Sequence, residues 1–138
     1  MKQYLILILI FSMTCCDSNS ERDDIDPNLN KIIGSWQVVS ESYSIGGPQI
    51  VTEVEDGSVY KFKGDGIFSY TNQKDSSKNY TGSFNLKEND VLTINFEKEG
   101  EERYWDFKTT FRSDLLTWYP IAPKVCIEGC STTFERRK

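Results

Sequence analysis

Residues 80–97 read Tyr-Thr-Gly-Ser-Phe-Asn-Leu-Lys-Glu-Asn-Asp-Val-Leu-Thr-Ile-Asn-Phe-Glu. Apolar or small side chains occupy every second position on both sides of the polar segment 88–90. A period of two is typical of a strand with one buried face, and a short polar segment between two such runs is typical of a turn. This stretch therefore predicts an antiparallel hairpin in which one face of each strand lies in a core.

The same alternation recurs from residue 31 onward, and no window there has the period of an amphipathic helix. Turn-forming segments such as Gly46-Gly47-Pro48 and Gly64-Asp65-Gly66 separate the runs. The pattern predicts eight strands, at about 34–43, 57–63, 66–73, 78–87, 90–98, 101–112, 115–119 and 130–137. Short, regularly spaced strands indicate an all-β domain, either a sandwich or an antiparallel up-and-down barrel.

The composition restricts the functions that this domain can have. The chain has 138 residues, enough for a single domain, and its net charge is −5. An acidic chain argues against binding to nucleic acid, which normally needs a basic face. The chain contains no histidine, which is the base of the common serine and cysteine hydrolases and a usual ligand of catalytic zinc. We therefore expect no enzyme, no metal site and no cofactor.

The N-terminus resembles the signal sequence of a bacterial lipoprotein. Lys2 precedes an apolar run at residues 4–13, which is too short for a membrane-spanning helix of about 20 residues. The following Ser-Met-Thr-Cys-Cys-Asp resembles a lipobox, in which a cysteine becomes the lipidated first residue. We favour Cys16 as that cysteine, with Cys15 as the alternative. Loss of Cys15 with the signal peptide leaves the two later cysteines as an even pair.

These assignments predict where the protein resides. Residues 1–15 are then a signal peptide, and residues 16–30 are an acidic, flexible tether with too few apolar side chains to fold. More than one acyl chain is needed to hold a protein stably on a membrane, and bacterial lipoproteins carry several. We expect an outer-membrane lipoprotein of the cell envelope, on either the periplasmic or the surface side. Residues 31–138 form the folded domain.

Three short motifs resemble one known family. Gly34-Ser35-Trp36 stands at the start of the first predicted strand and resembles the kernel motif of the lipocalins. The segments 60–66 (Tyr-Lys-Phe-Lys-Gly-Asp-Gly) and 134–136 (Phe-Glu-Arg) are similar to segments of the small lipocalin-like lipoproteins of Gram-negative bacteria. The resemblance covers residues 31–138 and implies an eight-stranded up-and-down barrel. It also implies a late-strand arginine packed over Trp36 by a cation–π contact, with Arg136 as the first candidate and Arg112 as the second.

The resemblance implies a binding role without specifying a ligand, and we expect a small hydrophobic or amphipathic molecule. Eight strands enclose a space wide enough for one small ligand. The predicted ligand-lining residues are the aromatic side chains that the alternation turns inward: Trp36, Tyr60, Phe62, Phe68, Phe84, Phe96, Trp105, Phe107 and Trp118. Large rings can equally fill a small barrel, so a packed core without a cavity is the alternative.

The two remaining cysteines predict a disulfide. Cys126 and Cys130 are separated by Ile-Glu-Gly, which can form a tight turn, and an oxidising envelope favours the bond. A zinc site would need two further ligands, and the chain has no histidine to supply them.

A second hypothesis is a surface module that binds proteins or glycans and whose barrel is packed. Its contacts would be Tyr43, Tyr70, Tyr119 and a long loop at 118–129. The carboxylates at 53–56 and 97–102 lie in predicted turns, and we interpret them as solvated rather than as a glycosidase pair.

Overall fold

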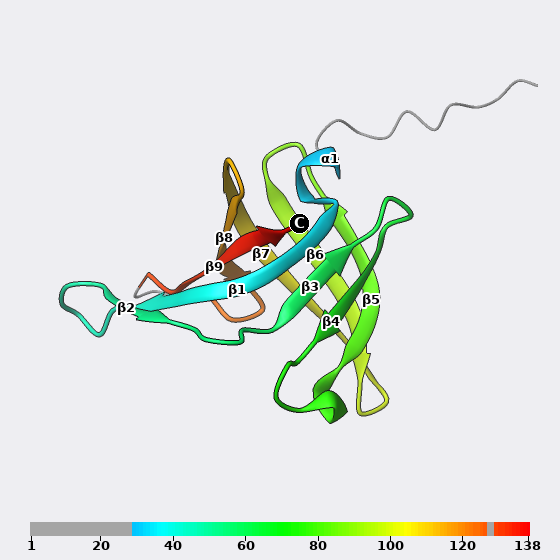
Figure 1. The fold of residues 1–138 in the computed structure, drawn as a ribbon, viewed down its shortest axis with the longest axis horizontal. Coiled ribbons are helices and arrows are strands. Elements are labelled where there is room, and N and C mark those ends of the chain that lie inside the picture. The colour runs from blue at the N-terminus through cyan, green and yellow to red at the C-terminus, as the bar shows by residue number, and fades with distance from the viewer. Residues whose placement is uncertain (1–28, 127–128) are drawn as a thin grey trace, which may run out of the picture.

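The computed structural model describes residues 29–126 and 129–138. In these residues nine strands form one antiparallel sheet, and an additional pairing of the first strand with the last closes it into a barrel (Figure 1). The elements are α1 (Leu29–Ile32), β1 (Gly34–Tyr43), β2 (Ile50–Glu53), β3 (Val59–Phe62), β4 (Ile67–Thr71), the 3-10 helix η1 (Ser76–Lys78), β5 (Tyr80–Leu86), β6 (Val91–Lys98), β7 (Glu101–Arg112), β8 (Leu115–Ala122) and β9 (Ser131–Arg137). From β3 to β9 each strand pairs with the next, as in an up-and-down barrel.

The prediction of an all-β, eight-stranded antiparallel up-and-down barrel is confirmed, with one extra strand. The strand that the sequence did not predict is β2, which pairs with positions 40–43 of β1, whereas β3 pairs with positions 34–37. All of β2 is exposed, so its side chains show no alternation that a period of two could detect. In addition, β8 extends to Ala122, so much of the loop predicted at 118–129 is strand.

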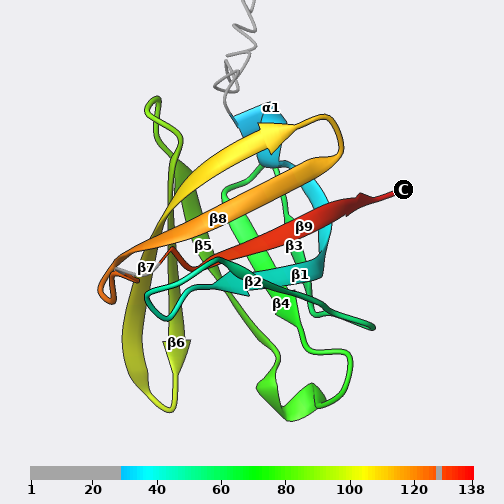
Figure 2. The ribbon, with the colours of Figure 1, turned by 90° about the vertical axis from the view of Figure 1, so that its left-hand side faces the viewer.

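The short helix α1 lies at one end of the barrel, beside the start of β1 (Figure 2). Ile32 is buried, and its carbonyl accepts a hydrogen bond of 2.6 Å from Trp36 Nε1. The helix begins at Leu29, within the segment predicted as a tether. The signal peptide predicted at 1–15 and the lipidation predicted at Cys16 or Cys15 lie outside the described residues. Within the described residues, no helix is long and apolar enough to cross a membrane.

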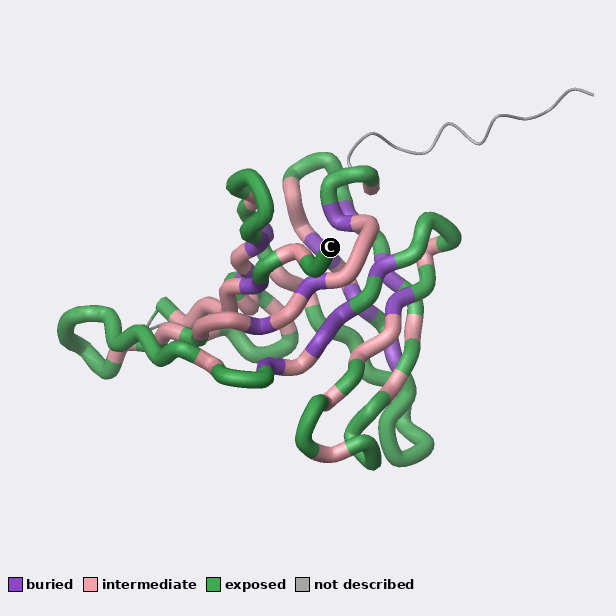
Figure 3. Tube along the Cα trace, viewed as in Figure 1, coloured by how far each residue is buried: buried purple, intermediate pink, exposed green. Residues whose placement is uncertain are grey.

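The core is made mainly of aromatic and aliphatic side chains at inward positions of the strands. Figure 3 shows buried residues along the strands and exposed residues at the hairpin tips. The buried cluster consists of Ile32, Trp36, Val38, Tyr60, Phe62, Phe68, Phe84, Leu86, Leu92, Ile94, Phe96, Leu116, Trp118 and Phe134. Half-buried rings on β7, Phe107 and Phe111, pack against it. The alternation read from the sequence therefore marks the inward face correctly on most strands.

Cys126 and Cys130 form the predicted disulfide, with their Cα atoms 5.6 Å apart. The bond lies in the connection between β8 and β9. Because the loop it closes is very short, the chain-entropy model gives a stabilisation of only about 2 kcal/mol.

Candidate ligand site at the open end of the barrel

The end of the barrel next to α1 is closed by Arg136. Its guanidinium carbon lies 4.2 Å from the centre of the Trp36 ring, which gives a cation–π contact. The same group donates hydrogen bonds of 2.7 Å to the carbonyls of Ile33 and Lys31, so it also ties α1 to β9. Gly34 has a φ of +130°, and a Cβ there would lie 2.7 Å from Arg136 Nη1. The Gly-x-Trp spacing thus leaves room for the arginine that covers the tryptophan.

A ring of aromatic side chains lines the opposite, open end of the barrel. It contains seven residues, which we call the aromatic collar: Tyr60, Tyr70, Tyr80, Phe96, Trp105, Phe107 and Trp118. Successive ring centres are 4.6–6.1 Å apart, and Trp118 returns to Tyr60 at 4.9 Å. Aromatic pairs at these separations attract each other beyond the area they bury. The collar therefore forms a continuous circuit over strands β3 to β8.

Inside the collar the structure has a pocket of about 190 Å³, which we call the inner pocket. Its lining is mostly aromatic, with a few polar groups: Val38, Glu41, Ser58, Tyr60, Tyr70, Trp105, Phe107, Trp118, Thr132 and Phe134. Trp118 is only 3% exposed, and its Nε1–H has no hydrogen-bond partner among the described residues. A buried donor without a partner costs about 1–3 kcal/mol.

A second, wider depression lies beside the inner pocket. This outer groove has a volume of about 580 Å³ and shares Trp105 and Phe107 with the inner pocket. Its lining comes from the first half of β7 and the end of β8: Glu102, Arg103, Tyr104, Trp105, Phe107, Pro120, Ala122, Pro123 and Lys124. Tyr104 and Trp105 are 50% and 37% exposed. Trp105 and Phe107 thus stand between the inner pocket and a groove with exposed aromatic rings.

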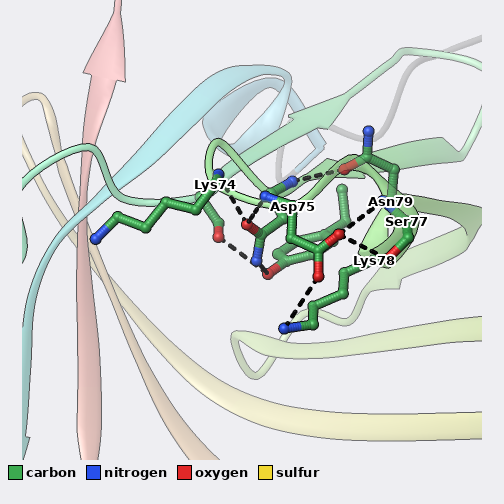
Figure 4. A network of polar contacts seen from close by, with 8 residues as sticks. Lys74, Asp75, Ser77, Lys78 and Asn79 are labelled. Atoms are coloured by element: carbon green, nitrogen blue, oxygen red, sulfur yellow. Dashed lines mark hydrogen bonds and ion pairs between the residues drawn. The ribbon is translucent and has the colours of Figure 1, made fainter.

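Hydrogen bonds fix the polar rim of the inner pocket. The hydroxyl of Tyr70 lies 2.9 Å from Ser58 Oγ and accepts a bond of 3.3 Å from Asn72 Nδ2. Asn72 in turn accepts hydrogen bonds from the backbone N–H groups of Lys74 and Asp75. Figure 4 shows this network, in which the loop between β4 and β5 folds back on its own side chains. A loop held in this way keeps the Tyr70 ring in place at the mouth.

Burial changes the acidity of two collar tyrosines. The pKa of Tyr60 is raised well above its usual value, first by desolvation and then by the nearby Tyr80, Tyr70 and Glu41. The pKa of Tyr80 is also raised, mainly by desolvation. Both phenols therefore stay neutral at physiological pH and offer hydrogen-bonding groups without charge.

Glu41 reaches the inner pocket because β1 contains a bulge. The register between β1 and β9 shifts between Val38 and Ser40. Before the shift Trp36 and Val38 are buried, and after it Glu41 pairs with Thr132, which lines the same pocket. One inserted residue reverses the alternation of a strand. The bulge thus places Glu41, an exposed residue, at the rim of the pocket, although its position in the period-two pattern would place it on the outer face.

The predicted ligand-lining residues divide between the pocket and the core. Tyr60, Trp105, Phe107 and Trp118 line the inner pocket. Phe96 belongs to the collar, in contact with Tyr80 and Trp105. The others, Trp36, Phe62, Phe68 and Phe84, are buried in the packed closed half, where Trp36 lies under Arg136. Arg112, the second candidate for that contact, is exposed.

The sequence pattern did not predict several of the residues that the structure places in the collar and the inner pocket. Tyr70, expected as a surface contact, is half-buried in the collar, and Tyr80 joins it there. Tyr80 already stands in the alternation of residues 80–86, and Tyr70 continues the alternation of Phe68, so the period of two places both rings on the inward face. Tyr43 and Tyr119 are exposed, at 44% and 39%. The pocket also contains Glu41 and Ser58, for which the sequence pattern carries no signal.

The acidic groups do not build a metal site in the described part of the chain, where no set of three or more potential ligands comes together. Glu53 lies on exposed β2, and Glu97, Glu99, Glu101 and Glu102 lie exposed around the β6–β7 hairpin.

The closed sheet, the capped tryptophan at one end and the pocket at the other define a small antiparallel β-barrel of the lipocalin-like type. Residues 32–118 match the model of the lipocalin-like domain family, and the chain belongs to this family. No curated protein matches the sequence.

Two solved structures from Bacteroides share the fold. A lipocalin-like protein from Bacteroides uniformis ATCC 8492 is 18% identical, covers 78% of this chain and 99% of its own, and has a TM-score of 0.55. An uncharacterized protein from Bacteroides eggerthii DSM 20697 is 16% identical, covers 77% of this chain and 99% of its own, and has a TM-score of 0.53. At this level of identity the likeness concerns the fold alone.

Proposed function

We propose that this protein is a lipid-anchored, non-enzymatic binding protein of the cell envelope that holds one small amphipathic molecule at the open end of its barrel. The observation that carries the proposal is the aromatic inner pocket, which the Trp118 ring lines. The N–H of that ring is buried and has no partner among the described residues. A ligand that presents an acceptor to this donor would recover the free energy that burial costs it. The surrounding rings would bury the apolar part of the ligand.

The size of the site limits the ligand. The inner pocket, at about 190 Å³, is smaller than the ~300–1,000 Å³ typical of sites for drug-sized molecules. The outer groove of about 580 Å³ adds space that is open to solvent. We therefore expect a compact head group in the inner pocket and a larger part of the ligand against Trp105 in the groove.

The test is a titration with Prodan, a neutral naphthalene dye that carries a carbonyl acceptor and whose emission shifts to the blue in an apolar site. The wild-type protein should bind it and shift its emission. Trp118→Phe keeps an aromatic side chain, although a smaller one, and removes the donor, so it should weaken binding by up to about tenfold, the equivalent of one hydrogen bond. Tyr119→Phe, an exposed ring on the same strand, is the matched control and should bind like the wild type.

Two results would contradict the proposal. One is the absence of any blue shift, together with native mass spectra that show no bound molecule. The other is a Trp118→Phe variant that is folded, as judged by circular dichroism, and binds the dye as tightly as the wild type.

The second candidate, a module that binds glycans, is favoured by the exposed Tyr104 and Trp105 in the outer groove. Exposed rings of this kind can stack on sugars, and such binding would not use the inner pocket. Soluble oligosaccharides should then protect Trp105 fluorescence from quenching in both the wild type and Trp118→Phe.

The anchor is proposed from the sequence alone. Cys16 carries the lipid, and metabolic labelling with a fatty acid tests it in Cys16→Ser, with Cys15→Ser as the control. We expect loss of label in the first variant and retention in the second. The reverse result would assign the lipid to Cys15. If neither the wild type nor the variants took up label, the anchor would be excluded.

A further inference from the structure

The charge of the residues that line the inner pocket indicates which ligands the pocket can prefer. Among the residues that line it, Glu41 alone carries a charge. Its carboxylate takes part in none of the ion pairs found among the described residues, which join Lys31 to Asp90, Lys78 to Asp75 and Arg103 to Glu101. The pocket therefore presents a negative charge that no cation of the described chain neutralises.

The rings of the aromatic collar favour a positively charged ligand, as Glu41 does. The face of an aromatic ring carries negative electrostatic potential and attracts a cation, most strongly for tryptophan. Rings of Tyr60, Trp105 and Trp118 surround the space at whose rim the β1 bulge places Glu41. An anionic head group would meet repulsion from the carboxylate and from the ring faces, and a neutral group would gain nothing from either.

The Trp118 N–H adds a second requirement. A cation does not accept a hydrogen bond, so a ligand that uses this donor must also carry an acceptor such as a hydroxyl, ether or carbonyl oxygen. The inner pocket is small enough that the acceptor and the cation must be close together on the ligand.

The outer groove does not share the preference of the inner pocket for a positive charge. Its charged lining residues are Glu102, Arg103 and Lys124, which include both signs, and Arg103 lies 3.2 Å from Glu101. Selection for charge is thus confined to the inner pocket, and the remainder of the ligand can be neutral.

We propose that the inner pocket selects a small organic cation, an ammonium or alkylated ammonium group, that bears a nearby oxygen acceptor. This inference rests on the proposed function and specifies the chemistry of its ligand. Glu41 and the ring faces bind the positive charge, and Trp118 donates to the oxygen.

Three probes of matched shape test the inference with the full mature protein. They are choline, its neutral isostere in which a tert-butyl group replaces the trimethylammonium group, and the tert-butylacetate anion. Binding is measured by tryptophan fluorescence and by ligand-observed nuclear magnetic resonance at low ionic strength. Choline should bind about tenfold or more tightly than the neutral isostere, and the anion should bind most weakly.

Glu41→Gln should weaken choline binding about fivefold to tenfold and leave the neutral isostere unchanged. Glu53→Gln, which removes an exposed carboxylate from the neighbouring strand β2, is the matched control and should leave both affinities unchanged. Thermal melting of each variant checks that the barrel remains folded.

The outcomes separate this inference from the proposed function. Equal binding of choline and its isostere, tighter binding of the anion, or an effect of Glu53→Gln as large as that of Glu41→Gln would each overturn it. So would the failure of all three probes to bind. If Prodan still binds in a way that depends on Trp118, the proposed function stands and only the preference for a cation is lost.

Discussion

Arg136 joins three parts of the closed end, two through its side chain and one through its backbone. Its guanidinium covers Trp36 on β1 and donates hydrogen bonds to the carbonyls of Ile33 and Lys31. Its backbone N–H donates a hydrogen bond to the backbone carbonyl of Asp114. A planar guanidinium can make both side-chain bonds and stack at the same time, and the ammonium of lysine cannot. This geometry explains why an arginine, rather than any cation, suits the position.

We predict that Arg136→Met lowers the free energy of unfolding by about 2 kcal/mol. A hydrogen bond to a charged group contributes about 1.5–3 kcal/mol, and partial exposure of this group reduces that contribution. Arg137→Met, at the exposed neighbouring position, should change stability by less than about 0.5 kcal/mol. Urea denaturation measures both, and an equal loss in the two variants would show that the closed end does not depend on Arg136.

Tyr60 makes stability depend on pH in the alkaline range. Its pKa is raised in the folded state, so above the usual tyrosine pKa of about 10 the unfolded chain releases a proton that the folded chain keeps. The stability it contributes is therefore complete below that pH and falls as pH rises, by up to about 1.4 kcal/mol per pH unit.

Tyr60→Phe should accordingly make the alkaline loss of stability less steep. Tyr43→Phe, at an exposed position, should leave the slope unchanged. Chemical denaturation at pH values on either side of 10 compares the slopes. Identical slopes in all three proteins would mean that Tyr60 ionises normally in the barrel.

In β5 the absence of a side chain at Gly82 lets the strand lie very close to its neighbours. Gly82 lies between two inward aromatic positions, Tyr80 and Phe84. A Cβ at Gly82 would lie 2.0 Å from the carbonyl oxygen of Asn95 and 2.8 Å from Phe68 Cε1. Backbone cannot move aside as a flexible side chain can, so the strand pair must separate to accept any larger residue.

Gly82→Ala should therefore destabilise the protein by at least about 2 kcal/mol, in the range of overpacked cores or beyond it. The control is Gly47→Ala in the β1–β2 connection, where an added Cβ would meet nothing within 4 Å. Thermal melting distinguishes them. A Gly82→Ala protein as stable as the wild type would show that β5 and β6 can separate at no cost.

At the scale of elements the sequence predicted β1 and β3 to β9 well and missed β2. Alternation is strong where one face is buried, as on β5 and β6, and absent where both faces meet water, as on β2. The bulge in β1 was also invisible, because it depends on how β9 pairs with β1 and not on the residues of β1 itself.

For the whole molecule, closure depends on β9, which pairs with both β1 and β8. Phe134 on this strand is 1% exposed and contacts both Tyr60 and Trp118. Without β9 the sheet would have two open edges, and the aromatic core would be exposed to solvent along one side.

Removal of residues 131–138 should abolish cooperative unfolding, whereas removal of Lys138 alone should leave the midpoint unchanged. Urea titration followed by tryptophan fluorescence and circular dichroism is the measurement. A cooperative transition in the truncated chain would show that the other strands form a stable open sheet.

Local pattern along the chain is enough to predict the strands with one buried face, their turns, the disulfide and the aromatic character of the core. These follow from periodicity and spacing along the chain, which local sterics and the cost of burying polar groups impose. Which aromatic rings pack the closed half and which surround a pocket depends on the three-dimensional arrangement of the strands. That arrangement also brings Glu41 to the lining of that pocket and buries the Trp118 N–H without a partner in the part of the chain that the structure describes. Both depend on strand register around a closed barrel, which couples residues far apart in sequence and which no local pattern contains.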